Sequence, residues 1–300
     1  MICYSIIFLY LWHMKFEKST TLYLFNIAFY CFLLVIPFLG LHAQRASSGE
    51  PITTEQGVYQ GKTSKGMPHG VGVMSYTNGD KYDGEYVKGK RHGKGKYTYS
   101  SGEYYEGDWK NDVKSGRGIF TWKDGSWYDG FWSDNIRVGK GVYRYATGDV
   151  YTGGWRNDLQ NGKGIYKFSN GDSYEGDYVN GERIGEGVFK YANGDRYVGH
   201  FSNGLKNGAG TFVWTNGDVY VGQWKDDKEN GRGRLTKRNG DICEGSFVNG
   251  EFEGEMTIYY SDGTKFHGTY KNGVRDGKGI EISKVGQRKE VIYNNGEIVQ

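Results

Sequence analysis

Hydrophobic and polar residues alternate along most of this chain, and short alternating runs return at a constant interval. One such run, from Tyr105 to Trp109, places an aromatic residue, a glycine and a second aromatic residue at every other position. Alternation of period two puts these three side chains on one face of a β-strand. The run returns every 23 residues without an insertion, and its ten copies begin at Tyr59, Tyr82, Tyr105, Tyr128, Tyr151, Tyr174, Tyr197, Tyr220, Cys243 and Phe266. A fixed period of about 20–50 residues indicates a repeat architecture.

Each unit contains a second alternating run, which predicts a β-hairpin. The run Ile119–Trp122 is an example, with bulky residues at positions 16 and 18 of its unit. Asn-Gly and Asp-Gly pairs such as Asn78-Gly79 follow these runs, and such pairs favour two-residue turns with positive φ. Position 8 holds only Gly, Asn or Asp, which tolerate the left-handed region. We therefore interpret the acids at position 8 as turn formers rather than ligands.

Glycine occupies position 3 in all ten units, and its missing side chain leaves room for a neighbouring ring or backbone to lie close. Composition supports this interpretation, since 50 of the 300 residues are glycine and 49 are aromatic (26 Tyr, 15 Phe and 8 Trp). An average protein has about 7% glycine. Aromatic side chains bury about 150–250 Å² each, so we predict a core of aromatic rings packed over glycine.

The pattern Tyr-x-Gly-x-aromatic, then Gly-x-Gly, an aromatic residue and Asn-Gly at a 23-residue period, resembles the MORN (membrane occupation and recognition nexus) repeat over residues 59–300. The resemblance implies an all-β fold, an elongated single-layer antiparallel sheet of tandem β-hairpins twisted into an open half-pipe. It also implies a scaffold or dimerisation platform, with binding of acidic phospholipid headgroups as a further proposed property. Two strands per unit give twenty strands, which at about 4.8 Å spacing would form a sheet on the order of 95 Å long.

The repeats are expected over residues 59–288, after a linker at 44–58 and before a C-terminal half-repeat cap at 289–300. One unit departs from the pattern, with Cys243 in place of tyrosine and Met256 in place of the second glycine of Gly-x-Gly. We expect local loosening in this unit, and we expect Cys243 to be a small core residue rather than a reactive thiol.

The segment 1–43 has a different composition and is typical of an export signal, with lysines before an apolar run and a cleavage site near Ala43. This predicts a periplasmic or secreted array. The apolar run, Leu22–Leu39, also reaches membrane-spanning length, so an uncleaved membrane anchor is the alternative. Either version places the repeats on the far side of the membrane. Translation from Met1 or from Met14 fits both versions.

Catalytic motifs are not found in the sequence pattern. The segment 57–63 suggests a phosphate loop, but its glycines are four residues apart where that motif requires five. No metal-ligand spacing or nucleophile elbow appears, and the histidines are scattered among units. We predict a non-enzymatic protein with no catalytic residue, cofactor or metal, and with no nucleic-acid partner.

Two groups of residues are candidate contact sites. The candidate partner patch consists of Tyr104, Trp127 and Phe131, which alternate with the repeating Tyr and Trp residues of their strands and so face the opposite side of the sheet. Its alternative role is packing over Ile119 and Val142. The candidate anion ladder is a set of cations at position 13 of consecutive units, about two strand separations or roughly 10 Å apart: Lys94, Arg117, Lys140 and Lys163.

Acids also recur through the array, as at Asp149 and Asp172, so a solvated mixed-charge surface is the alternative interpretation of the ladder. The function predicted from the sequence is an exported or membrane-anchored scaffold for protein–protein interaction. The sequence does not identify the partner, and a second copy of the chain is one candidate. The alternatives are a glycan-binding or cell-wall-binding module that stacks aromatic rings on sugars, and a protein that binds anionic phospholipid.

Overall fold

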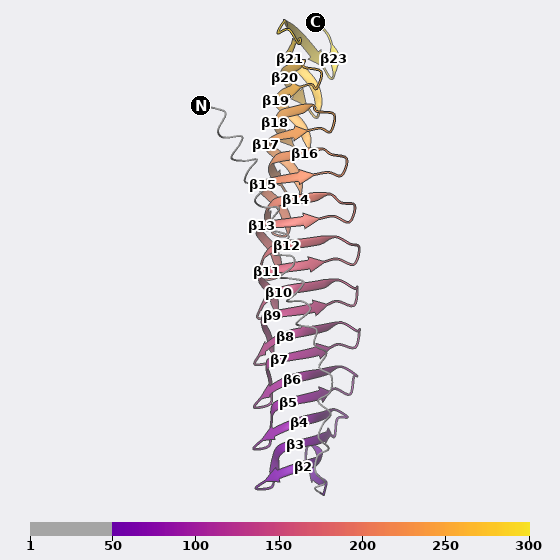
Figure 1. Cartoon of the computed structure of the whole chain (residues 1–300), viewed down its shortest axis with the longest axis vertical. Helices are drawn as coiled ribbons and strands as arrows, with labels where there is room; N and C mark the ends of the chain where they lie inside the picture. Colours follow the sequence, from indigo (N-terminus) through magenta and orange to yellow (C-terminus); the bar gives the residue numbers. More distant parts are fainter. Residues whose placement is uncertain (1–49) are drawn as a thin grey trace. The chain divides into compact units, whose positions relative to one another are not determined.

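The computed structural model describes residues 50–300, which form one antiparallel sheet of 23 strands with no helix in that range (Figure 1). Each strand pairs with the strand before it and the strand after it in the chain, from the first strand to the last. The strand bounds are β1 Ile52–Thr54, β2 Gly57–Ser64, β3 Met67–Tyr76, β4 Lys81–Val87, β5 Lys90–Thr98, β6 Tyr104–Lys110, β7 Val113–Thr121, β8 Trp127–Ser133, β9 Ile136–Arg144, β10 Val150–Arg156, β11 Leu159–Lys167, β12 Ser173–Val179, β13 Glu182–Lys190, β14 Arg196–Ser202, β15 Leu205–Val213, β16 Val219–Lys225, β17 Lys228–Thr236, β18 Ile242–Val248, β19 Glu251–Tyr259, β20 Lys265–Lys271, β21 Val274–Ile282, β22 Arg288–Asn294 and β23 Glu297–Ile298.

The ten sequence units occupy β2–β21, with one hairpin in each unit. In the hairpin of β6 and β7, Tyr105 lies opposite Phe120 and Gly107 lies opposite Gly118. A register shift between Gly107 and Trp109 introduces a bulge, and the equivalent shift returns in the other units. The prediction of an open antiparallel sheet of tandem hairpins is therefore confirmed.

The sheet extends beyond the ten units at both ends. Strand β1 pairs with β2 through residues 52–54, inside the segment that the sequence pattern assigned to a linker. This strand is short and lies outside the 23-residue pattern. Its backbone still pairs with β2, so the outer edge of β2 is not left exposed. At the other end, β22 and the two-residue β23 fall in the half-repeat.

Two kinds of turn alternate along the sheet, and the prediction for one of them was wrong. The short turn at positions 7 and 8 has both residues in the left-handed region, as at Asn111 (φ 49°) and Asp112 (φ 72°), which confirms the prediction for position 8. The turn at Asn78-Gly79 is longer, because only Gly79 has a positive φ, of 88°. The Gly79 N–H donates to the Tyr76 carbonyl, and the Asn78 side chain accepts from the Asp80 N–H. Asn78 thus stabilises the turn through its side chain, and its own φ stays negative.

Tyrosines at position 1 form the centre of the core, on the face of the sheet that we call the aromatic face. This face carries positions 1, 5, 10, 16 and 18 of each unit. Tyr105 is fully buried and meets Trp109 of its own unit edge-to-face at 5.1 Å, and Trp132 of the next unit at 5.5 Å. Its hydroxyl donates to the Asp108 carbonyl at 3.0 Å. Each tyrosine thereby joins its own unit to the next one.

Glycines at positions 3 and 14 make room for these tyrosines. A Cβ atom at Gly95 would lie 2.5 Å from Cζ of Tyr82, and a Cβ atom at Gly84 would lie 2.5 Å from Cα of Gly95. Neither distance is compatible with a real side chain. The predicted packing of aromatic rings over glycine is therefore confirmed.

The two exceptional residues of the unit at Cys243 are both buried, and the expected loosening of this unit stays a prediction. Cys243 is a free cysteine that is 2% exposed, which confirms its prediction as a core residue. Met256 is 1% exposed, and its sulfur lies over Gly245, where the tyrosine ring lies in other units. The methionine thus replaces the missing ring, and the small cysteine leaves it the space.

Aspartates at position 22 connect the longer turns of successive units. Their carboxylates accept a hydrogen bond from the backbone N–H twenty residues further on, at 2.8 Å between Asp149 and Ser169, and this contact recurs at Asp80, Asp149, Asp172, Asp195, Asp218 and Asp241. The backbone hydrogen bond lowers the pKa of Asp149, of Asp195 and of Asp241 below the ordinary value. The recurring acids therefore have a structural role that the sequence did not reveal.

These lowered pKa values predict a loss of thermal stability in acid. A carboxyl group with a lower pKa in the folded state contributes stability that is complete above its unfolded pKa of about 3.9. That contribution is lost as the pH falls through the folded pKa. We expect the Tm, measured by circular dichroism, to be flat between about pH 8 and pH 5 and to fall below about pH 4.

The combined variant Asp149→Asn, Asp195→Asn and Asp241→Asn is the control for this prediction. It should have a lower Tm at neutral pH and a shallower decrease in acid, because three of the titrating groups are gone. A decrease of unchanged steepness would contradict the assignment.

Candidate functional site

A row of cations crosses the aromatic face at position 10. Position 10 lies opposite position 5 in each hairpin, as Lys114 does opposite Trp109, so its side chain shares the face of the core rings. The charged groups lie over rings of their own unit and of the following unit, at 4.7 Å between Lys114 Nζ and the Phe120 centroid and 4.6 Å between Lys114 Nζ and the Trp132 centroid. Such distances are typical of cation–π contacts. We call this set the position-10 ladder: Arg91, Lys114, Arg137, Arg183, Lys206 and Arg275.

Acids at position 8 are the counterions of part of this ladder. Arg91 pairs with Asp112 at 3.1 Å and Arg137 pairs with Asp158 at 2.9 Å, each across the boundary between two units. The same carboxylates accept the backbone N–H of the two arginines at 2.9 Å. These aspartates are therefore turn formers, as predicted, and also ion-pair partners, which the sequence interpretation did not include.

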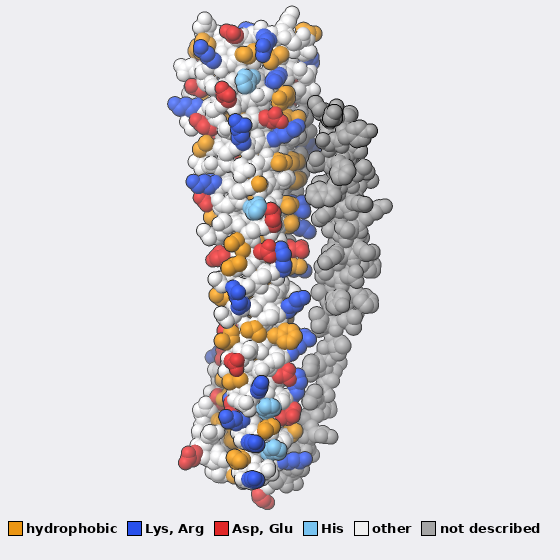
Figure 2. All heavy atoms as spheres, turned by 90° about the vertical axis from the view of Figure 1, so that its left-hand side faces the viewer, with side chains coloured by type: hydrophobic (Ala, Val, Ile, Leu, Met, Phe, Trp, Pro, Cys, Tyr) orange, Lys and Arg blue, Asp and Glu red, His pale blue; other side chains and the backbone are white. Residues whose placement is uncertain are grey.

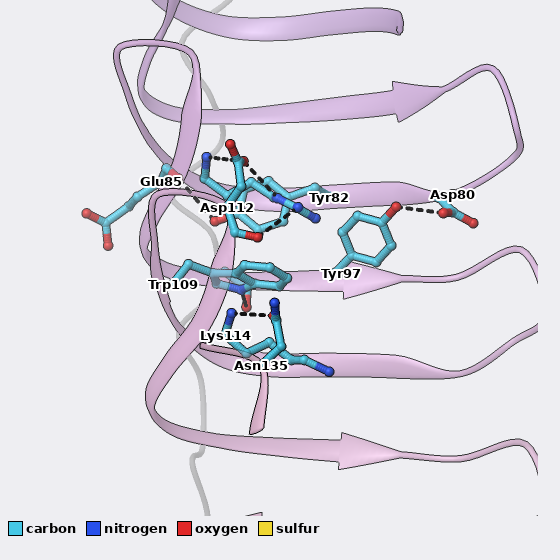
Figure 3. A network of polar contacts seen from close by, with 10 residues as sticks. Asp80, Tyr82, Glu85, Tyr97, Trp109, Asp112, Lys114 and Asn135 are labelled. Carbon is cyan, nitrogen blue, oxygen red and sulfur yellow. Dashed lines mark hydrogen bonds and ion pairs between the residues drawn. The ribbon is translucent and has the colours of Figure 1, made fainter. Parts of the chain in front are cut away.

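Three cations of the ladder, Lys114, Arg183 and Lys206, have no carboxylate in ion-pair contact among residues 50–300, whereas Arg275 pairs with Glu281 at 3.6 Å. Lys114 meets Asn135, whose side-chain oxygen accepts the Lys114 backbone N–H, as Figure 3 shows. For Arg183, position 8 of the following unit is Gly204, which has no side chain to pair with the guanidinium group. Arg183 donates instead to the Gly204 carbonyl at 2.6 Å. Burial lowers the pKa of Lys114 and of Lys206. The ladder is thus divided into neutralised and open cations.

Cavities open on the aromatic face in the C-terminal half of the array, and two of them lie beside position 10. One has a volume of about 430 Å³ and lies beside Arg183 and Lys206, with aromatic walls. The other has a volume of about 340 Å³ and lies beside Glu229, which takes the place of a cation at position 10, with Trp214 and Phe252 in its lining. These cavities open at the units where the pattern of position 8 or position 10 is interrupted.

The candidate partner patch lies on the face opposite the core, as the alternation predicted. Trp127 and Phe131 lie on β8, and Tyr104 lies on β6. Thr121 of β7 pairs with Tyr104 on one side and with Trp127 on the other. Phe131 is 48% exposed. Tyr104 is half-buried under the ammonium of Lys96, 4.2 Å from its ring centroid. The three residues are neighbours on one face, and their binding role stays a prediction.

The candidate anion ladder also lies on this opposite face, where acids accompany it. Lys94 pairs with Asp108 at 2.6 Å, Arg117 pairs with Asp129 at 3.4 Å, and Lys163 pairs with Asp177 at 2.7 Å. Lys140 faces Gly154 across the strand pair. Figure 2 shows one side of the array, where basic and acidic side chains are interspersed. This arrangement favours the mixed-charge interpretation, and anion binding by the four cations stays a prediction.

Other predictions concern chemistry and the N-terminal segment. Residues 50–300 contain no group of three or more His, Cys, Asp or Glu side chains placed to hold a metal ion. The same residues contain no helix long and apolar enough to span a membrane. The export signal, the cleavage site near Ala43 and the alternative anchor Leu22–Leu39 lie outside the described residues.

Several solved structures are similar to the chain at low identity. The TCP10 domain of Danio rerio CPAP in complex with a STIL peptide has 12% identity over 71% of this chain and 99% of that chain, with a TM-score of 0.37. The Drosophila melanogaster SAS-4 (dCPAP) TCP domain, with a proline-rich motif of dSTIL, has 17% identity over 52% and 85%, with a TM-score of 0.34. Virginiamycin B lyase from Staphylococcus aureus has 13% identity over 77% and 71%, with a TM-score of 0.15. All three scores are below 0.5, so we infer function from this chain's own residues.

A comparison with curated protein sequences finds no match. A comparison with protein families finds the MORN repeat in ten consecutive stretches, at residues 57–81, 82–104, 105–127, 128–150, 151–173, 174–196, 197–219, 220–242, 243–265 and 266–288. These stretches coincide with the hairpins β2–β21 and with the ten units of the sequence pattern. The chain therefore belongs to the MORN repeat family.

Proposed function

We propose that this chain is a non-enzymatic scaffold that binds an extended segment of a protein partner on its aromatic face. The observation that carries the proposal is the position-10 ladder, a row of cations over aromatic rings with two cavities beside it. Aromatic and arginine side chains are the residues most enriched where proteins bind one another. The opposite face is a mixed-charge surface in which cations pair with acids.

The repeat period suits an extended partner. One unit contains two strands and so advances by roughly 10 Å, which equals about three residues of extended polypeptide at about 3.3 Å per residue. A partner segment that runs along the array would place side chains over successive units. A second copy of this chain is one such partner, and self-association remains part of the proposal.

Export or membrane anchoring completes the proposal and rests on the sequence alone. The lysine-flanked apolar run Leu22–Leu39 and the site near Ala43 favour an array that works on the far side of a membrane. Partners would then be periplasmic, secreted or membrane-bound proteins.

The glycan and lipid alternatives have weaker support. Sugar stacking needs exposed ring faces, but the position-1 tyrosines are fully buried, and several rings at position 16 are buried too. Binding of anionic phospholipid needs a cationic surface, but three of the four cations at position 13 pair with acids.

Affinity capture with the full-length chain from extracts of its native host tests the proposal. We expect protein partners that stay bound at about 0.5 M salt, because aromatic contacts are not screened as exposed charges are. Vesicles of anionic phospholipid and cell-wall polysaccharide are assayed in parallel. Retention of only lipid or glycan, with no protein retained, would overturn the scaffold proposal.

A further inference from the structure

In two places an aspartate at position 8 is the counterion of the position-10 cation in the preceding unit. Asp112 and Asp158 neutralise Arg91 and Arg137. At Gly204 the side chain is missing, so Arg183 has no ion pair with another residue in 50–300. Its guanidinium group lies 5.4–5.7 Å from the ring centroids of three aromatic residues: Tyr174, Phe189 and Phe201.

Lys206, one unit further on, is a second open cation. The residue is only 9% exposed, and its ammonium lies 4.6 Å from the Trp224 ring centroid and 3.4 Å from the Tyr191 hydroxyl. The nearby Asp227 carboxylate accepts the Lys206 backbone N–H at 2.9 Å and forms no ion pair with the ammonium. A buried cation without a paired anion is unfavourable.

These two cations lie beside the same cavity of about 430 Å³ on the aromatic face. Aromatic walls lower the local dielectric constant, which strengthens charge interactions beside them. The planar guanidinium group binds a carboxylate through two parallel N–H donors, and the ammonium supplies a third. The cavity walls are Phe168, Phe189, Tyr191 and Phe201, with Gly204 and Asp227 at the cations.

We propose that this cavity, defined by Arg183, Lys206 and Gly204, is a subsite for the carboxylate of an aspartate or glutamate in an extended partner segment. The proposal rests on the proposed function, since the rest of that segment lies along the aromatic face. Asp227 lines the same cavity and repels any anion there. A single carboxylate has one negative charge, whereas a phosphate monoester has about −1.5 to −2 at pH 7 and would be repelled more strongly. The chemistry therefore favours an acidic side chain over a phosphorylated group or a lipid headgroup.

The substitution Gly204→Asp tests this subsite, because it copies the arrangement at Asp112 into the open unit. Asp112 has φ 72° and Gly204 has φ 78°, so the new residue keeps a backbone conformation that the same turn already accepts. Its carboxylate is expected to pair with Arg183 and to occupy the subsite. The matched control is Gly181→Asp, which adds the same charge one unit earlier, where the preceding position 10 is the neutral Gln160.

The binding probe is a fluorescein-labelled peptide of ten alternating glutamate and threonine residues, measured by fluorescence anisotropy with the full-length chain. Loss of a hydrogen-bonded charge pair should weaken binding by about tenfold or more in Gly204→Asp. We expect Gly181→Asp to stay within about twofold of the unchanged chain. Arg183→Gln, which leaves the backbone unaltered, should weaken binding as Gly204→Asp does. A peptide with glutamine for glutamate should bind all of these chains equally.

Equal weakening by Gly204→Asp and Gly181→Asp would overturn the subsite, because it would show a general charge effect. The subsite is also overturned if inorganic phosphate or vesicles with phosphorylated headgroups displace the peptide better than acetate does. Absence of binding of the glutamate peptide to the unchanged chain overturns it as well. None of these results tests the proposed function, which is tested separately by the capture of protein partners with the full-length chain.

Discussion

The Cys243→Tyr variant is expected to lose about 1–3 kcal/mol or more of unfolding free energy, because the new ring has no space. In the other units a position-1 ring lies over glycines at positions 3 and 14. In this unit the sulfur of Met256 already lies over Gly245, and both Cys243 and Met256 are buried. The two exceptional residues thus fill one volume together, and changing only one of them should overpack it.

The double variant Cys243→Tyr, Met256→Gly restores the pattern of the other units and should recover the lost stability. Met256→Gly alone leaves a cavity and is expected to lose about 2–5 kcal/mol, as truncations of buried methionine do. Urea unfolding followed by circular dichroism measures all four chains as a double-mutant cycle. Additive losses in the double variant would contradict the claim that the two side chains share one space.

The Tyr128→Ala variant is expected to lose about 3–5 kcal/mol, the range for truncation of a large buried aromatic residue. Tyr128 is fully buried between Trp132 and Trp155, each with its ring centroid 5.2 Å away. Its hydroxyl also donates to the Phe131 carbonyl at 3.2 Å. Since repeats are stabilised by their neighbours, the loss should separate the array into two less cooperative halves, visible as a broader unfolding transition.

Two substitutions on the same strand serve as controls. Tyr128→Phe removes only the hydroxyl and should cost about 1 kcal/mol. Phe131→Ala changes the half-exposed ring on the opposite face and should stay within about 0.5 kcal/mol of the unchanged chain, as surface substitutions do. A loss in Phe131→Ala equal to that in Tyr128→Ala would show that the core extends over both faces.

The fold could be predicted because each unit repeats the same local rules. The constant spacing of tyrosines such as Tyr105, and of glycines such as Gly107, fixes strand register, core face and hairpin number at once. The left-handed turn at Asp112 could be predicted because only three residue types occur at its position. In each case the restriction on residue type has one physical cause.

The counterion role of Asp112 could not be read in the same way. Arg91 and Asp112 lie 21 residues apart in the sequence and meet only because one hairpin follows another across the unit boundary. Aligning the units by column would have shown the cations at position 10. The length of the turn at Asn78 was predicted wrongly, because an Asn-Gly pair fits both a two-residue turn and a longer one. The hydrogen bonds of the turn decide between the two. Strand β1 lies outside the repeats, so the 23-residue period could not predict it.

Site-specific photo-crosslinking is the measurement that tests the central claim most directly, because it assigns partner binding to one face of the sheet. A photoreactive phenylalanine is placed in the full-length chain at Trp122, on the aromatic face, or at Trp127, on the opposite face. Both residues are half-buried and only five positions apart. We predict that the partner captured from the native host crosslinks at residue 122 and much less at residue 127. Crosslinking mainly at residue 127 would contradict the aromatic-face account and assign partner binding to the patch of Tyr104, Trp127 and Phe131.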